Sequence, residues 1–203
     1  MSSRLPALKP AELDGAQREL YDSLLANEIP LFDKAGVEVV AADGSLLGPF
    51  NPLLLNPAFG AAQIDVFRAD KTSSSLSRRV HEIVILVVGA AWGSGYELYA
   101  HGIVGGLAGL PADVVQALVS GRRPELEDEQ EASAYEFARQ LAYEHRIDSE
   151  AYARAAEAFG PRGLVDIVLL IGLYLTTCAI INAFDVPAPQ NEVSASDAAV
   201  HAQ

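Results

Sequence analysis

The sequence predicts an all-α fold. Apolar residues recur at helical spacing along most of the 203-residue chain, and prolines and glycines stand where helices would begin or end. Only residues 37–47, with Asp43-Gly44 between two short apolar runs, suggest a small hairpin or an ordered loop. Half of the residues are hydrophobic and a fifth are charged, so the chain can bury a sizeable core.

Composition and charge narrow the classes of partner. A formal net charge of −13 argues against nucleic acid and anionic membranes, because phosphate binding needs clustered lysine and arginine. The single cysteine, Cys178, excludes an intrachain disulfide and a CxxC pair. The first 15 residues lack the apolar core of a signal peptide, so we expect a cytoplasmic protein with a small-molecule substrate.

The N-terminal part predicts one amphipathic helix followed by an arm. This helix is expected to follow Pro10, with four leucines on one side: Leu13, Leu20, Leu24 and Leu25. We assign residues 1–48 to an N-terminal helix and arm, residues 49–187 to a helical domain, and residues 188–203 to a flexible C-terminal tail of small and polar residues.

Two Asn-Pro pairs, at residues 51–52 and 56–57, resemble helix N-caps followed by proline at the first helical position. They predict two short helices, or one kinked helix, from residue 51 to about residue 70. Residues 71–75 are expected to form a polar turn, and Ser77 is expected to cap the next helix.

The middle of the chain predicts two adjacent helices. The first follows Ser77 and carries an apolar run that ends at Gly93-Ser94-Gly95. The second extends from about Gly95 to Ala108. The step Gly109-Leu110-Pro111 then begins another short helix.

The C-terminal part predicts three more helices. A charged, exposed connection at residues 122–131 leads into a helix from Glu131 to about His145. Helices from Ser149 to Phe159 and from Arg162 to about Ala183 follow. The apolar run from Ile167 to Ile181 is about 15 residues long, short of the roughly 20 that span a bilayer, so it predicts a buried core helix.

Three side chains that carry protons stand beside the central apolar run. Glu97 and His101 are four residues apart and share one face of a helix. Glu82 lies near the start of the preceding run, which the glycine break allows to fold back. An acid, a second acid and an imidazole can thus converge in a largely dry pocket, as proton-transfer chemistry requires.

These residues carry a resemblance to a known family. From Leu76 to Gly109, LSRRVHEIVILVVGAAWGSGYELYAHGIVGGLAG resembles the carboxymuconolactone decarboxylase family, which shares the all-helical fold of AhpD-like proteins. A weaker likeness extends from about Pro49 to Pro187. It implies a helical bundle of this type that assembles as a homo-oligomer, a dimer, trimer or hexamer, with sites near subunit contacts.

The peroxidase branch of this family has a glutamate, a CxxC pair and a histidine. In this chain the glutamate falls on Glu82 and the histidine on His101, but the thiol positions fall on Ser94 and Glu97. Disulfide exchange needs a thiolate, which a hydroxyl cannot replace. The chain is therefore similar to the thiol-free members, and a thiol peroxidase role is disfavoured.

The decarboxylase branch implies a cofactor-independent lyase that acts on a small carboxylated lactone or an unsaturated keto acid. His101 would be the acid or base, Glu97 would orient it and Glu82 would complete a relay. Arg78 or Arg79 would hold the substrate carboxylate. The remaining substrate-binding candidates are Trp92, Tyr96 and Ser94.

Each candidate also has a purely structural interpretation. Glu97 and His101 form a pair of the kind found on solvated helix faces. Arg78 and Arg79 are typical of helix surfaces or salt bridges, and Ser94 of a helix N-cap. Similar interpretations hold for the rest: Trp92 and Tyr96 as core, Cys178 as a small buried hydrophobe, and His81 without a role.

No metal or cofactor is predicted. Glu82, Glu97 and His101 lack a second histidine at helical spacing, and no HExxH, GxGxxG or Walker-type motif occurs. Besides the lyase, another proton-transfer reaction in the same pocket, such as isomerisation or lactone hydrolysis, is open. A third alternative is a non-catalytic protein that binds a ligand or only assembles. A closed pocket would favour this last alternative, and an open pocket with an arginine directed into it would favour the lyase.

Overall fold

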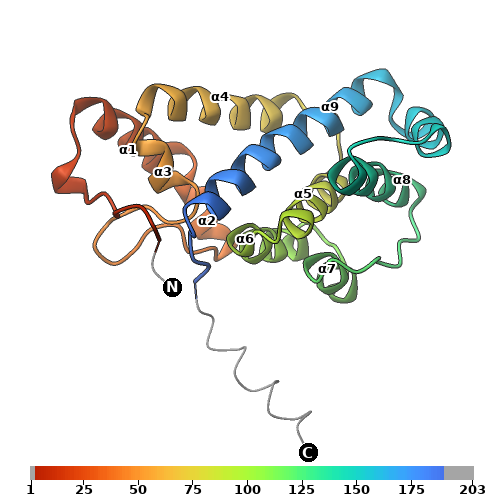
Figure 1. The fold of residues 1–203 in the computed structure, drawn as a ribbon, viewed down its shortest axis with the longest axis horizontal. Coiled ribbons are helices and arrows are strands. Elements are labelled where there is room, and N and C mark those ends of the chain that lie inside the picture. Colours follow the sequence, from red (N-terminus) through yellow and green to blue (C-terminus); the bar gives the residue numbers. More distant parts are fainter. Residues whose placement is uncertain (1–2, 190–203) are drawn as a thin grey trace, which may run out of the picture.

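The computed structural model describes residues 3–189 and confirms the all-α fold (Figure 1). Within these residues the β pairing is limited to one antiparallel bridge, between Val40 and Leu46. Residues 37–47 are therefore an ordered loop, with no paired strands. Gly44 turns this loop with φ at 83°, in the left-handed region that glycine favours.

The first helix begins later than predicted. A single 3-10 turn, η1 (Pro10–Glu12), precedes α1 (Gly15–Asn27). Asp14 caps α1 in a reciprocal arrangement, because its carboxylate accepts from the Gln17 backbone N at 2.9 Å while the Gln17 side chain accepts from the Asp14 backbone N. This box, rather than Pro10, sets the start of the helix.

The buried side of α1 was also only partly predicted. Leu20, Tyr21 and Leu24 are buried, whereas Leu25 is exposed. A second short helix that the sequence did not predict, α2 (Ile29–Ala35), follows directly and ends at Gly36. α2 packs against α1 and also contacts α6.

The two Asn-Pro pairs have different roles. Asn56 is the predicted cap, because its side chain accepts from the Phe59 backbone N at the start of α4 (Pro57–Ser73). The prediction for Asn51 was wrong, since it lies inside α3 (Phe50–Leu54). Its buried amide instead accepts from Leu8 N at 2.9 Å and donates to Pro6 O at 3.0 Å, which holds the N-terminal arm in place.

The predicted polar turn at residues 71–75 is shorter than expected, because α4 continues to Ser73. The next helix, α5 (Arg78–Trp92), begins as predicted, with the Ser77 hydroxyl accepting from Val80 N. This helix lies at the centre of the bundle and contacts α6, α7, α8 and α9 (Figure 1). It ends at Gly93, whose φ of 59° reverses the chain.

Two glycines bring the central helices together. The chain continues as α6 (Gly95–Leu107) and α7 (Ala112–Val119). A Cβ at Gly89 would lie 3.2 Å from the Leu98 side chain, and one at Gly105 would lie 3.8 Å from Glu82 Cβ. This close approach of α5 and α6 places the groups that they carry face to face.

The last helices are partly fused. The predicted helix from Glu131 is α8 (Glu129–Arg139) and continues as one π-helical turn, η2 (Gln140–Glu144). The two helices predicted at residues 149–159 and 162–183 are the two parts of α9 (Ser149–Ala183), which are separated by the non-helical backbone of Gly160, with φ at 62°, before Pro161.

The C-terminal half of α9 is the predicted core helix. It is long and apolar enough to cross a membrane by composition alone, but half of its most apolar window is buried inside the protein. It packs on α5 and α8 through residues that include Ile167, Leu170 and Cys178. A second apolar cluster lies beneath the N-terminal arm. The predicted tail falls mostly on residues 190–203, which lie outside the described residues.

Candidate functional site

The structure brings Glu82, Glu97 and His101 together at the contact between α5 and α6. Glu82 Oε2 lies 2.8 Å from His101 Nδ1, and Glu97 Oε2 lies 3.5 Å from His101 Nε2. Less than a tenth of each residue is exposed. The imidazole is therefore held between two carboxyl groups, one from its own helix and one from the neighbouring helix.

The pKa values of the two carboxyl groups shift in opposite directions. Burial opposes ionisation of Glu82, but the charge and hydrogen bond of His101 lower its pKa to about 2. Burial instead raises the pKa of Glu97, against an opposing effect of His101 and with a smaller contribution from the negative charge of Glu82. Glu82 is thus a carboxylate at neutral pH, whereas burial opposes the ionisation of Glu97.

His101 is the positively charged partner of the Glu82 carboxylate. Burial alone would lower its pKa, but the adjacent Glu82 carboxylate raises it above the usual value. Because Glu82 can only accept a hydrogen bond, His101 Nδ1 must carry the hydrogen between them. Nε2 then remains to donate or accept a proton. The ring is further fixed by an edge contact with Tyr174, with centroids 5.1 Å apart.

A second imidazole, which the sequence had left without a role, extends this arrangement. His81 Nε2 lies 2.6 Å from Asp70 Oδ2 on α4, and its Nδ1 lies 3.8 Å from Glu82 Oε1. Burial opposes its protonation, but Asp70 and Glu82 raise its pKa to about 9. Acids and imidazoles therefore alternate from Asp70 through Glu82 to Glu97. Because His81 precedes Glu82 directly in the sequence, an interaction between them could have been predicted. Nothing in the local sequence indicated that Asp70 would join them.

The cluster lines a cavity of about 830 Å³ that opens to solvent. Its walls are largely apolar and include residues of α2, α3, α4, α5, α6 and α9. Of the sequence-predicted site residues, Glu82, Glu97, His101, Arg78 and Tyr96 line it. The Tyr96 hydroxyl donates to Glu38 O at 2.7 Å, which ties α6 to the loop after α2.

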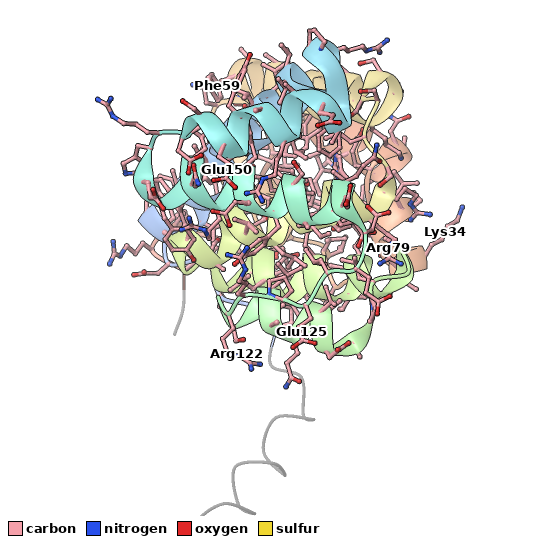
Figure 2. All side chains as sticks on the ribbon, turned by 90° about the vertical axis from the view of Figure 1, so that its right-hand side faces the viewer. Lys34, Phe59, Arg79, Arg122, Glu125 and Glu150 are labelled. Carbon is pink, nitrogen blue, oxygen red and sulfur yellow. The ribbon has the colours of Figure 1, made fainter. Side chains whose placement is uncertain are left out.

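Three predicted substrate-binding residues lie outside the cavity lining. Arg79 forms a salt bridge to Glu131 on α8, with Nε 2.6 Å from Oε1, and lies at the edge of the molecule in Figure 2. Trp92 is exposed at the end of α5, where its carbonyl accepts from Asn182. Ser94 is fully buried, and its hydroxyl makes no cap hydrogen bond, unlike that of Ser77.

The lone cysteine lies behind the cluster as a buried thiol. Burial and the neighbouring Glu97 raise the pKa of Cys178 to about 12, against a smaller opposing effect of the Ser94 hydroxyl. The thiol is therefore protonated at neutral pH and is a poor nucleophile. In the part of the chain that the structure describes, no group of three His, Cys, Asp or Glu side chains is arranged to hold a metal ion.

Comparisons with known proteins identify the fold. No protein-family model and no curated protein matches the sequence. Solved structures do match, among them an uncharacterised peroxidase-related protein from Ralstonia eutropha JMP134 with an alkylhydroperoxidase AhpD core. It is 18% identical, with a TM-score of 0.72 over 94% of each chain.

Two further structures have the same architecture. An alanine variant of the debrominase Bmp8, in complex with 2,3,4-tribromopyrrole, is 15% identical, with a TM-score of 0.71 over 93% of this chain and 94% of its own. A peroxidase-related protein from Silicibacter sp. TM1040 is 18% identical, with a TM-score of 0.69 over 90% and 91%. At these identities the likeness establishes the AhpD-like fold.

Proposed function

We propose that the protein is a cofactor-independent lyase that releases carbon dioxide from a carboxylated lactone or an unsaturated keto acid. The observation that carries this proposal is the buried Glu82–His101 pair, which opens on a large, mostly apolar cavity. The same cavity is lined by Arg78. An open pocket with an available arginine favours catalysis over a purely structural role.

The reaction needs one proton for each turnover. When the bond to the departing carboxylate breaks, carbon dioxide leaves and the electron pair remains on the substrate as an enolate or dienolate. His101 would donate its Nε2 proton to one carbon of that anion and so form the product. Glu82, bound to Nδ1, stabilises the imidazolium before transfer and fixes the orientation of the ring.

Glu97 is suited to return the proton to His101. It is buried, which raises its pKa, and its Oε2 lies 3.5 Å from His101 Nε2. The proton that each turnover consumes comes from solvent at the open cavity, and Glu97 would relay it to His101. In its protonated form Glu97 can also donate a hydrogen bond to the enolate oxygen. Apolar walls lower the local dielectric and strengthen both interactions.

Thiol chemistry is a weaker alternative, although two of the similar structures are described as peroxidase-related and one as a debrominase. Cys178 is the only cysteine, and its raised pKa keeps it protonated. Isomerisation or lactone hydrolysis by the same acid–base groups is distinguished from decarboxylation by its products, since neither releases carbon dioxide.

The test is to incubate the wild type, His101→Ala and Glu97→Gln with a panel of carboxylated lactones and unsaturated keto acids, and to follow carbon dioxide. Loss of the general acid should lower kcat by roughly 10² to 10⁴-fold. Glu136→Gln, on α8 away from the cavity, is the control and should keep its activity per folded molecule. Full activity of His101→Ala would overturn the mechanism.

We also propose that the protein is a cytoplasmic homo-oligomer. On α9 the exposed side chains include Val165, Val168 and Leu169, and on α4, which contacts α9, they include Phe59 and Val66. Exposed apolar side chains of this kind support an association face. Light scattering of the purified chain should give at least twice the monomer mass, and Leu169→Glu should lower it.

A further inference from the structure

The charged side chains that line the cavity leave an excess of positive charge. Three acid–base pairs on its wall are internally compensated, each with its oppositely charged groups within 2.8 Å: Glu28 with Arg68, Asp70 with His81, and Glu82 with His101. Glu97 lies beside the same imidazole, with its Oε2 3.5 Å from His101 Nε2. Each acidic group of the lining therefore lies against a basic group.

Two cations remain, Lys71 at the end of α4 and Arg78 at the start of α5. Both line the cavity, both are exposed, and neither forms an ion pair with any residue between 3 and 189. They flank the short connection between α4 and α5, so the two charges lie at one rim. In a chain with a net charge of −13, a cavity with an uncompensated positive rim is selective for an anion.

Most of the remaining lining is apolar. Aromatic residues from five helices line the cavity: Phe32, Phe50, Phe67, Tyr96 and Tyr174. A volume of about 830 Å³ lies in the upper part of the range of cavities that enclose drug-sized ligands. A short keto acid would leave most of this apolar surface without a partner.

From these observations we infer that the cavity binds an amphipathic carboxylate, with its anionic group at Lys71 and Arg78 and an apolar ring or chain along the aromatic wall. This inference rests on the proposed function and names its substrate class. Arg78 precedes Glu82 by one helical turn, about 6 Å along the axis. A ligand whose anionic group is bound at the rim can therefore extend the rest of its structure as far as His101.

A substrate of the proposed lyase must therefore carry a second carboxylate, because the product retains the anchored one. Pairing a carboxylate with cations stabilises the ground state and so opposes its loss as carbon dioxide. The departing carboxylate must instead lie against His101 and the apolar wall, where charge is less well solvated. The cavity thus separates a binding end from a reacting end.

Calorimetric titration of the full chain tests this inference without turnover. The probes are 3-phenylpropionate, the matched 3-phenylpropan-1-ol and 3-phenylpropylamine, and pyruvate as a carboxylate with little apolar surface. We expect 3-phenylpropionate to bind at least tenfold more tightly than each of the other three. Equal affinity for the alcohol would overturn the anionic anchor, and equal affinity for pyruvate would overturn the apolar wall.

Variants that each remove one positive charge test whether Lys71 and Arg78 bind the carboxylate. Arg78→Gln and Lys71→Gln should each lower affinity for 3-phenylpropionate about five- to tenfold and leave the affinity for the alcohol within twofold. Arg122→Gln and Lys34→Gln are the controls, because these cations lie outside the cavity lining at the molecular surface (Figure 2). If the controls weaken binding as much as the rim variants, the anion responds only to overall charge and the inference is wrong.

The outcome also separates this inference from the proposed reaction. Binding of 3-phenylpropionate that depends on Arg78, with no carbon dioxide released from any carboxylated substrate, would support the ligand class and reject the lyase. His101→Ala should keep the binding preference even where it abolishes turnover. Carbon dioxide release that is unaffected by Arg78→Gln and Lys71→Gln would reject the anchor and keep the lyase.

Discussion

Two buried carboxylates, Glu82 and Glu136, are almost equally hidden from solvent, at 7% and 8% exposed, yet their surroundings differ. Glu136 on α8 accepts hydrogen bonds from Arg123, Arg139 and Gln140. These partners hold fixed protonation states, and the Arg139 hydrogen bond, ahead of the opposing effect of burial, lowers the pKa of Glu136. Glu82 is instead surrounded by histidines.

The difference shows which kind of buried charge can do chemistry. Arginine and glutamine can only hold Glu136 in place, because neither exchanges protons near neutral pH. Histidine can do so, and the cluster of Glu82 lines an open cavity. The cluster of Glu136 thus connects α8 to the turns around it, while the cluster of Glu82 has the properties of a reaction centre.

The largest expected difference between substitutions of Glu82 and of Glu136 is in catalytic activity. Glu82→Gln removes the negative charge that sustains the His101 imidazolium, so the carbon dioxide release proposed above should fall by roughly 10²-fold or more. Glu136→Gln should leave kcat within threefold, measured per folded molecule by circular dichroism. Equal losses in the two variants would mean that burial alone, and not the histidine partners, determines the effect.

For the free energy of unfolding, we expect the larger loss at Glu136 and the smaller loss in the histidine-containing cluster. Glu136→Ala leaves its arginine partners without their acceptor and should lower the free energy of unfolding by about 2 kcal/mol, since hydrogen bonds to charged groups contribute about 1.5–3 kcal/mol. Glu97→Gln replaces a carboxyl group whose ionisation burial already opposes, so its cost should be smaller. Urea denaturation measures both. A larger loss for Glu97→Gln would indicate that Glu97 is ionised.

Titration of His81 tests the acid–imidazole arrangement directly. Its pKa is raised to about 9 from an ordinary value of 6.5, so its contribution to stability is complete below pH 6.5 and is lost as the pH rises through about 9. Nuclear magnetic resonance of the ring should show a midpoint near 9 in the wild type. Asp70→Asn should move this midpoint toward 6.5, and an unchanged midpoint would remove Asp70 from the arrangement.

The smallest effect is expected at Trp92. Its side chain is 42% exposed and lies outside the cavity lining. Trp92→Phe should change kcat and KM by less than twofold and the free energy of unfolding by less than about 0.5 kcal/mol, as for most surface substitutions. A tenfold rise in KM would place Trp92 in substrate binding after all.

Local patterns account for what could be predicted. The caps at Asn56 and Ser77 and the shared face of Glu97 and His101 depend on residues three or four apart. Other local predictions failed where a distant contact competed with the local one. Asn51 is the clearest case, because its amide holds the backbone of residues 6–8 instead of capping a helix.

By itself, the sequence determined the helical class and the residues able to exchange protons, because helical periodicity and side-chain chemistry are properties of short segments. Only the tertiary structure decided which of them act together. The contact between Glu82 and His101 joins residues that are 19 positions apart in the sequence. The same role was predicted for Arg78 and Arg79, but Arg78 lines the cavity and Arg79 forms a salt bridge with Glu131. Adjacent residues on a helix point about 100° apart, so packing assigns one to the cavity and its neighbour to a salt bridge.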